Sequence, residues 1–246
     1  MHVKYITLFT VLTVFITTQC KIQMQDNNTN NIDLQKEELI SSWQERGVDV
    51  DPTILEAFRL VPRHYFTLPE YQKFAYADKP LPIPGGQTIS QPATVVLMLD
   101  ALNIKPGQRI LEVGAGSGYN ASMLATLVGP KGKVFSTEII PELASFARKN
   151  LQKSDIKNVK VLQIDGSKGY SRQAPFDRII VTAGAPRIPL ALINQLANGG
   201  IMLIPADSNG SQTMFRISKS EGGIKIEDLG AYRFVPLTGK YGKRTQ

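Results

Sequence analysis

The feature that most constrains the fold is an alternation of short apolar runs with helical patterns over residues 109–206. The runs are rich in Val and Ile, and those that we expect to be strands are RILEV, KVFSTE, VKVLQI, FDRIIVTA and GGIMLIPA. The segments between them that carry helical patterns are YNASMLATLV, PELASFARKNL and PLALINQLA. Apolar strands that alternate with helices are buried on both faces and pair in parallel. We therefore predict an α/β fold with a Rossmann-like doubly wound, mostly parallel sheet.

Other elements flank this sheet in the sequence. Apolar residues at helical spacing within residues 34–43 predict one helix. Asp51-Pro52, an N-cap followed by proline at the first helical position, predicts a second helix that runs to Leu60. We expect these two to be N-terminal accessory helices. Beyond the sheet, residues 213–230 alternate with a period of two around a glycine-containing turn, which predicts a C-terminal antiparallel hairpin.

The segment from Val61 to Pro84 is rich in proline. Its prolines exclude a long helix or a central strand. We predict a long structured loop here, and its length makes residues 67–84 a candidate lid over a binding site. A further apolar helix is expected from Pro92 to Leu102.

The chain begins with a pattern typical of a secretory leader. Lys4 precedes an apolar run, Tyr5 to Ile16, that is too short to span a bilayer comfortably. We predict a signal peptide over residues 1–20. Cys20, the only cysteine, stands where a lipoprotein signal has its lipidated residue. The leader could be removed by simple cleavage, or Cys20 could carry a lipid that tethers the protein to a membrane. The alternative to a signal peptide is an uncleaved membrane anchor.

The remaining organisation follows from composition. Residues 21–32 are polar and rich in Asn, which predicts a flexible linker, and residues 33–246 then form the folded domain. We expect a periplasmic or cell-envelope protein, with the cytoplasm as the alternative. The formal net charge of +7 comes from scattered Lys and Arg, which does not favour nucleic acid as a partner. We expect a monomer.

A glycine-rich loop follows the first strand of the sheet. Gly114, Gly116 and Gly118 stand between Val113 and a helix that we expect to open near Tyr119. Glycines there let the chain turn sharply and let a nucleotide-like ligand approach the backbone at the carboxyl end of the strand. The spacing is GxGxG and not the GxGxxG of dinucleotide-binding proteins.

Three acidic residues end successive strands and would share one rim of the sheet. Glu112 precedes the loop, where a carboxylate suits a cationic amino-acid group. Glu138 stands where it can accept both hydroxyls of a ribose, and Asp165-Gly166 suits an adenine amino group. Each carboxylate could instead have a local role as a cap or in a turn. Together they resemble the pattern of class I S-adenosylmethionine-dependent methyltransferases, which implies S-adenosyl-L-methionine as cofactor; no metal site is expected.

The segment after the fourth strand bears on the methyl acceptor. Residues 182–186 read TAGAP, without the Asn/Asp-Pro-Pro-aromatic sequence with which nucleic-acid amino methyltransferases grip a base. A base amino group is therefore not expected as acceptor. A carboxylate acceptor is already ionised at neutral pH and needs no general base, so alignment with the donor would suffice.

A closer resemblance lies in motifs that occur in order between about Asp33 and Gly242. These are VPRHYF, AYAD, GQTISQP, the glycine loop, DGSKG, APFDRIIVT and FVPL. Together they resemble the protein-L-isoaspartate O-methyltransferase family, to which VPRHYF and GQTISQP are the most specific. The resemblance implies methylation of the free α-carboxylate of isoaspartyl residues in damaged proteins and peptides. The ester then collapses unaided to a succinimide that opens partly to Asp, which is protein repair.

The resemblance also implies roles for single residues. Thr88 and Ile89 would belong to the active-site segment over the methyl donor, with Ser90 in the catalytic position, where its hydroxyl can donate to the acceptor carboxylate. Gln212 would contact the cofactor. The alternative for Thr88 and Ser90 is that they only cap the helix that follows. His64 is expected to be packed and hydrogen-bonded and not to act as a base.

The leader is the main departure from this family, whose members are usually cytoplasmic. Because the core pattern looks bacterial, a bacterial envelope is the expected site of an exported protein. Two alternatives to protein repair stay open. One is methylation of another acceptor, a small molecule or RNA, and the other is a non-catalytic cofactor-binding adaptor.

Overall fold

The computed structural model describes residues 31–208 and 210–243. The predicted signal peptide and most of the predicted linker lie outside these residues. Residues 31–45 form a helix, as the apolar spacing predicted, so the described chain is already helical at two positions that we assigned to the linker. This helix belongs to a unit that ends at Gly47, and a second unit begins at Val48. None of the described helices is long and apolar enough to cross a membrane.

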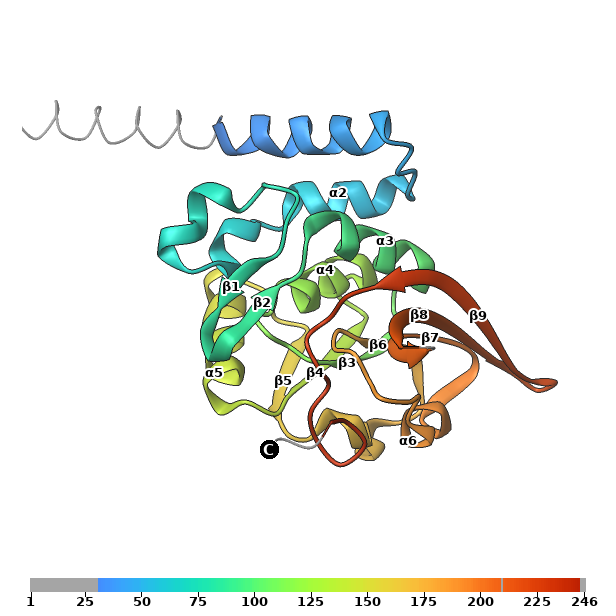
Figure 1. The fold of residues 1–246 in the computed structure, drawn as a ribbon. Helices are drawn as coiled ribbons and strands as arrows, with labels where there is room; N and C mark the ends of the chain where they lie inside the picture. Colours follow the sequence, from blue (N-terminus) through green and yellow to red (C-terminus); the bar gives the residue numbers. More distant parts are fainter. Residues whose placement is uncertain (1–30, 209, 244–246) are drawn as a thin grey trace, which may run out of the picture. The chain divides into compact units, whose positions relative to one another are not determined.

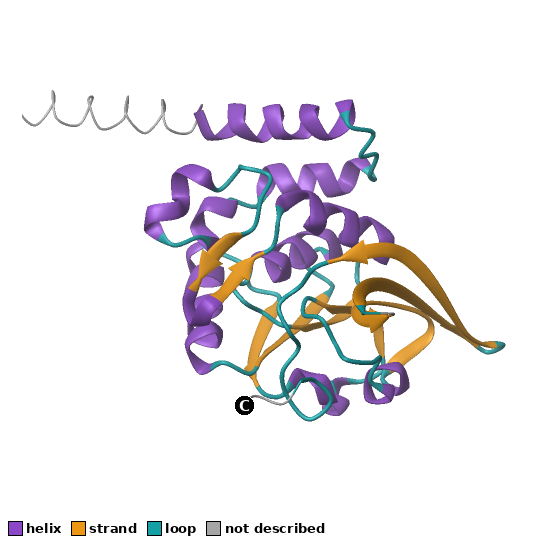
Figure 2. Ribbon diagram, in the orientation of Figure 1, coloured by secondary structure: helices purple, strands orange, loops and turns teal. Residues whose placement is uncertain are grey.

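A seven-stranded sheet lies at the centre of the second unit, in the order β5-β4-β3-β6-β7-β8-β9 (Figure 1). The strands are β3 (Arg109–Val113), β4 (Lys133–Glu138), β5 (Val159–Gln163), β6 (Phe176–Val181), β7 (Leu196–Ser208), β8 (Ser211–Ser220) and β9 (Gly223–Tyr232). Strands β3 to β7 pair in parallel, whereas β7, β8 and β9 pair antiparallel. The predicted α/β sheet and C-terminal hairpin are therefore confirmed, and the hairpin extends one edge of the same sheet (Figure 2).

The central strands are buried on both faces. Ile110 and Leu111 of β3 are both 0 % exposed, although neighbouring side chains of a strand point to opposite faces. Leu111 belongs to a cluster that includes Leu192 from a helix. The helices of this unit are α2 (Pro52–Leu60), α3 (Pro92–Leu102), α4 (Tyr119–Val128), α5 (Pro141–Lys153) and α6 (Leu190–Asn194). Burial on both faces is what a doubly wound sheet requires.

Helix α6 is shorter than the sequence pattern predicted. The pattern ran from Pro189 to Ala197, but the helix ends at Asn194 and β7 begins at Leu196. Leu196 pairs with Phe176 of β6. Hydrogen bonding within the sheet therefore outweighs helical propensity over the last turn of this pattern.

The Pro-rich segment is more regular than the loop that we predicted. It contains two short 3-10 helices, η1 (Arg63–Phe66) and η2 (Pro69–Phe74), and a strand β1 (Leu81–Ile83). Strand β1 pairs antiparallel with β2 (Gln87–Ile89) in a separate two-stranded sheet, with exposed Pro82 opposite Thr88. Proline is tolerated there because the strand has only one partner. The end of the candidate lid, Leu81–Ile83, and the QTI sequence are thus the two arms of one hairpin, which runs past α5 in Figure 1.

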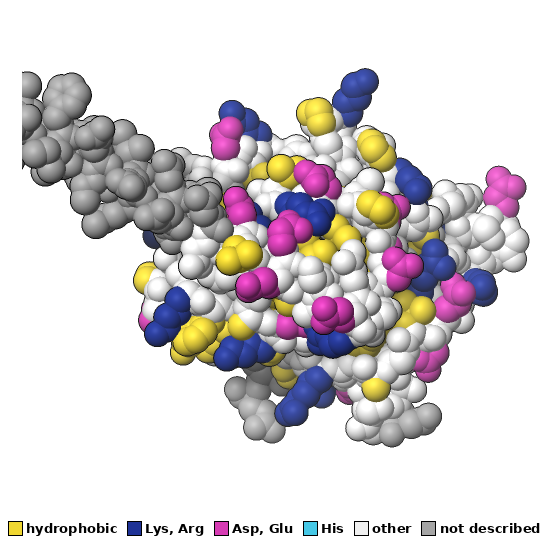
Figure 3. Space-filling model, turned by 90° about the horizontal axis from the view of Figure 1, so that it is seen from above, with side chains coloured by type: hydrophobic (Ala, Val, Ile, Leu, Met, Phe, Trp, Pro, Cys, Tyr) yellow, Lys and Arg dark blue, Asp and Glu magenta, His cyan; other side chains and the backbone are white. Residues whose placement is uncertain are grey.

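Charged side chains of both signs are interspersed over the face shown in Figure 3. This agrees with the scattered positions of Lys and Arg in the sequence.

Candidate active site

A cavity opens at the carboxyl ends of β3, β4 and β6, beside the β1–β2 hairpin. Its walls come from residues 87–90, the glycine loop, the turn after β4 and residues 235–238. Polar residues of the lining include Thr88, Ser90, Ser117, Asn120, Glu138 and Thr182. In the sheet, β3 lies between β4 and β6, and the strand order runs in opposite directions on its two sides, so the cavity lies at the switch point where open α/β sheets bind ligands.

The glycine loop has the backbone that its sequence predicted. Gly114, Gly116 and Gly118 have φ values of +100°, +53° and +86°. A Cβ atom on Gly114 would lie 2.4 Å from Oγ1 of Thr182, and one on Gly118 would lie 3.2 Å from a backbone oxygen of α5. At Gly116, which lines the cavity, the nearest atom would be 3.5 Å away. Two glycines are therefore needed for packing and conformation, and Gly116 leaves space for a ligand.

Glu138, at the end of β4, lines the cavity and is 6 % exposed. Its Oε2 accepts a hydrogen bond from the Gly116 N–H at 3.0 Å, and its Oε1 accepts one from the Ile140 N–H at 3.0 Å. Each carboxylate oxygen has a further lone pair. The group is thus held in one orientation and can still accept two hydroxyls, which is the geometry that the predicted ribose contact needs.

Glu112 lies beneath the loop and does not line the cavity. Its side chain is 0 % exposed, its Oε1 accepts from Nδ2 of Asn120 at 2.8 Å, and its Oε2 accepts from the Ser136 hydroxyl. Burial raises the pKa of Glu112 to about 7, against the effect of these two hydrogen bonds. The predicted direct contact with a cationic group is not seen, because Glu112 pairs in register with Ser136 and points into the interior. Asn120, which Glu112 holds, lines the cavity instead.

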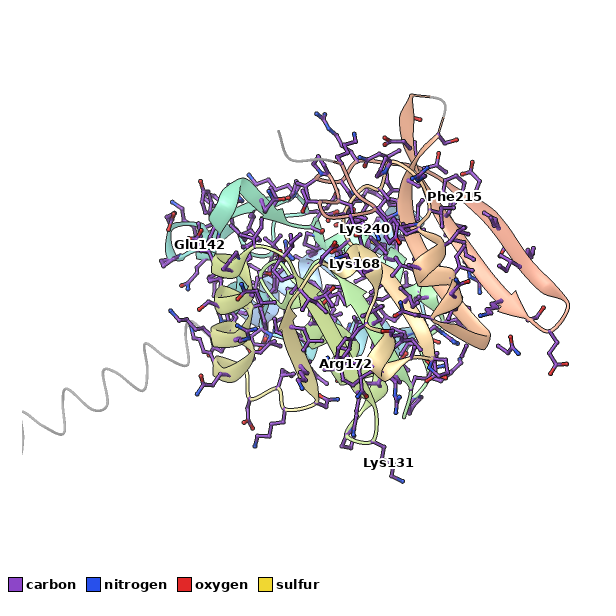
Figure 4. The ribbon with its side chains drawn as sticks, turned by 90° about the horizontal axis from the view of Figure 1, so that it is seen from below. Lys131, Glu142, Lys168, Arg172, Phe215 and Lys240 are labelled. Carbon is purple, nitrogen blue, oxygen red and sulfur yellow. The ribbon has the colours of Figure 1, made fainter. Side chains whose placement is uncertain are left out.

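Asp165 is also bound by protein groups instead of facing the cavity. Its Oδ1 accepts from the N–H and hydroxyl of Ser167, and its Oδ2 accepts from the Lys240 N–H at 2.9 Å. Burial opposes ionisation, but the hydrogen bonds outweigh it and lower the pKa of Asp165. Figure 4 shows Lys168 and Lys240 close together where the C-terminal segment passes this turn. The predicted adenine contact is therefore not seen for Asp165, whereas Gly166 does line the cavity.

Gln212 does not reach the cavity either. Its Oε1 accepts from the Phe234 N–H at 2.7 Å, and its Nε2 donates to the Phe234 carbonyl at 3.2 Å. Its side-chain amide makes a pair of hydrogen bonds to the backbone next to residues 235–238. Gln212 thus fixes one wall of the cavity from behind.

Thr88, Ile89 and Ser90 all line the cavity. Helix α3 has no side-chain cap from its N-cap residue, and the Ala93 N–H donates instead to Oδ1 of Asp78 at 3.0 Å. The alternative in which Thr88 and Ser90 serve only as caps is therefore not supported. The segment that contains them faces the glycine loop across the cavity.

Other titratable groups near the site have structural contacts. Nδ1 of His64 lies 3.1 Å from the Tyr76 hydroxyl, its ring lies edge-on to Tyr65, and it is not among the lining residues. His64 is packed and hydrogen-bonded, as we predicted. Within residues 31–208 and 210–243, no cluster of three or more His, Cys, Asp or Glu side chains could hold a metal ion.

Several lining residues were not predicted from the sequence. Among them, Asn120 lies in the first turn of α4, and Ile139 and Ile140 follow Glu138 directly. Their positions next to the glycine loop and to the acid at the end of β4 were the available signals. Asn120 adds an amide, and Ile139 and Ile140 add apolar surface, to the part of the cavity that the glycine loop and Glu138 form.

Comparison with known sequences agrees with this geometry. The family model of protein-L-isoaspartate(D-aspartate) O-methyltransferases matches residues 34–242. The protein-L-isoaspartate O-methyltransferase of Pyrococcus horikoshii is 44% identical over 220 residues, which cover 86% of this chain and 99% of that protein. That of Methanococcoides burtonii is 49% identical over 193 residues, 78% of this chain and 95% of that protein. These relatives are archaeal, so the expectation of a bacterial chain finds no support in them.

Two solved structures share the fold over most of the chain. A protein-L-isoaspartate O-methyltransferase has a TM-score of 0.77 and 30% identity, with 84% of this chain and 67% of that chain covered. The Plasmodium falciparum protein of that name, in complex with S-adenosyl-L-homocysteine, has a TM-score of 0.73 and 27% identity, with 82% and 97% covered. The predicted Rossmann-like fold is confirmed. The chain belongs to the protein-L-isoaspartate(D-aspartate) O-methyltransferase family.

Proposed function

We propose that this protein transfers the methyl group of S-adenosyl-L-methionine to the free α-carboxylate of L-isoaspartyl residues in damaged proteins and peptides. This ester starts their repair through a succinimide. The observation that carries the proposal is that Ser90, in the family-specific segment, and Gly116, in the donor loop, line the same cavity. The family match over residues 34–242 and relatives named for this activity support it.

The residues on the donor side fit S-adenosyl-L-methionine. Glu138 has lone pairs for the ribose hydroxyls, Gly116 leaves space for the ligand, and Ile139 offers apolar surface for the adenine ring. The Asn120 amide, held by Glu112, offers a polar group to the amino-acid end. When bound, this cofactor supplies a methyl group already activated by a sulfonium, so the protein has only to align the acceptor and exclude water.

On the acceptor side, Ser90 is the residue that we propose as catalytic. Its hydroxyl donates one hydrogen bond to the acceptor carboxylate and orients it without neutralising its charge. No base is required, because the carboxylate arrives ionised, which agrees with the position of His64 outside the cavity. Residues 235–238 form a further part of the wall, and backbone hydrogen bonds of Val235 and Leu237 with Gly184 hold this segment in place.

Replacement of Ser90 tests this assignment. Ser90→Ala is expected to lower kcat for an isoaspartyl peptide by roughly 10- to 100-fold, because one hydrogen bond to the acceptor is lost. The dissociation constant of S-adenosyl-L-homocysteine, measured by calorimetry, should change less than about threefold. Ser220→Ala, which removes an exposed hydroxyl in the β8–β9 turn, is the control and should leave both values unchanged. An unaltered kcat in Ser90→Ala would remove Ser90 from the site.

We also propose that the leader exports the protein to the periplasm or cell envelope as a monomer, with either a lipid tether on Cys20 or a cleaved N-terminus beside it. The motif around Lys4, residues 5–16 and Cys20 supports this proposal. Mass spectrometry of the N-terminal peptide from fractionated cells tests it. A lipidated or new N-terminus at or just after Cys20 is expected, and an intact Met1 in the cytosolic fraction would contradict it.

A further inference from the structure

A buried cation lies under the active-site segment. Arg63, in η1, is 0 % exposed. Its Nε donates to the Ala75 carbonyl at 2.8 Å, and its Nη2 donates to the Ser90 carbonyl at 2.7 Å. One side chain therefore ties the Pro-rich segment to the residue that we propose as catalytic.

The same guanidinium also contacts the donor side of the cavity. Its Cζ lies 4.9 Å from the centre of the Tyr119 ring. Tyr119 is the first residue of α4, follows the glycine loop directly and lines the cavity. The guanidinium of Arg63 thus contacts one residue of the acceptor side, Ser90, and one residue next to the glycine loop, Tyr119.

The charge of Arg63 is not neutralised by an ion pair with any residue that the structure describes. The negative charge of Asp78 acts on it and raises its pKa, against the effect of burial. Burial lowers the pKa of Arg63 to about 10, so the side chain stays protonated at neutral pH. In the described part of the chain, Arg63 Nη1 and the Tyr119 hydroxyl are the buried side-chain polar atoms without a hydrogen bond of ordinary geometry, and these two groups interact with each other.

Arg178 shows what a structural arginine is like in this fold. It is 6 % exposed, lies near the start of β6 and points its guanidinium at backbone carbonyls. Its Nε donates to Leu102, its Nη1 to Asp177 and its Nη2 to Asn103. Every nitrogen of Arg178 therefore has a partner, at the end of the sheet opposite the cavity.

We infer that Arg63 is a positioning residue for the methyl acceptor. This inference rests on the proposed function of Ser90. Arg63 fixes the Ser90 carbonyl and places a positive charge behind the cavity, where it attracts the anionic carboxylate of an isoaspartyl residue. Because Arg63 is buried, donates to the Ser90 carbonyl and does not line the cavity, it does not clamp the carboxylate and so leaves its oxygen nucleophilic.

The test compares an anionic with a neutral ligand. Dissociation constants are measured by calorimetry, with S-adenosyl-L-homocysteine bound, for an isoaspartyl peptide and for the same peptide with its α-carboxylate replaced by an amide. In Arg63→Met the preference for the anion should fall by roughly 10- to 100-fold relative to the unmodified protein. Arg178→Met, the matched loss of a buried arginine, should leave the preference unchanged. Binding of S-adenosyl-L-homocysteine and the melting temperature report whether each variant is folded.

A second variant decides the question if Arg63→Met does not fold. Asp78→Asn keeps an oxygen that can accept from the Ala93 N–H but removes the negative charge that acts on Arg63. The preference for the anion should rise by about threefold. An unchanged preference in a folded Arg63→Met, or in Asp78→Asn, would overturn the inference even if isoaspartyl peptides are methylated. Absence of methylation by the unmodified protein would instead overturn the proposed function.

Discussion

At the level of single residues, several polar side chains that the sequence predicted as ligand contacts do not line the cavity and instead hydrogen-bond to residues in or next to its wall. Glu112 holds Asn120, Asp165 holds the Lys240 backbone, and Gln212 holds the Phe234 backbone. Glu112, Asp165 and Gln212 lie close to the cavity, as the sequence indicated, but their side chains hydrogen-bond to other parts of the chain. The cavity is therefore shaped by fixed backbone and amide groups, which suits a reaction that needs alignment more than acid–base chemistry.

Glu112 gives a prediction about pH. Its folded-state pKa of about 7 lies above the ordinary value of 4.5, so the folded protein binds this proton more tightly than the unfolded chain. The resulting stabilisation, roughly 3 kcal/mol, is complete below pH 4.5 and is lost as the pH rises through 7. Glu112→Gln stays neutral and should lack this loss. We expect urea unfolding, measured without the methyl donor, to show that the unfolding free energy of the variant rises relative to that of the unmodified protein between about pH 5 and pH 8. Parallel pH dependences of the two unfolding free energies would contradict this prediction.

At the scale of elements, the glycine loop and the β1–β2 hairpin bring the two sides of the reaction together. The loop turns because three of its residues have positive φ, and the hairpin turns through Gly85 and Gly86, which also have positive φ. A Cβ atom on Gly85 would lie 3.7 Å from the Ile140 side chain, which places the hairpin turn beside the donor wall. Both turns therefore depend on glycine for conformation.

Two glycines of the loop should respond differently to a methyl group. Gly114→Ala is expected to cost roughly 3 kcal/mol of unfolding free energy, because the added Cβ meets Thr182 Oγ1 and the backbone is strained. Gly116→Ala, with no close neighbour, should cost only about 1 kcal/mol but should weaken donor binding, because the methyl group enters the cavity. Denaturant unfolding and calorimetry with S-adenosyl-L-homocysteine separate the two effects. Equal losses of stability would show that the Thr182 contact is unimportant.

At the scale of the whole molecule, the sheet was predictable because its signal is repeated along the chain. Apolar strands alternate with helices from Arg109 to Ala206, and the structure follows them closely. The partners of Asp165 and Gln212 were not predictable, because they lie 75 and 22 residues away and meet only in the folded chain. Arg63 was missed for the same reason, since its contact with Ser90 spans 27 residues.

Methylation of an isoaspartyl carboxylate in this cavity can be measured with a pair of matched peptides. The protein is incubated with S-adenosyl-L-methionine labelled in its methyl group and with two peptides of identical sequence, one isoaspartyl and one aspartyl. We predict a base-labile label in the isoaspartyl peptide alone, because the donor loop and Ser90 line one cavity and the chain belongs to the family that methylates isoaspartyl residues. Equal labelling of both peptides, or no labelling of either, would contradict the account.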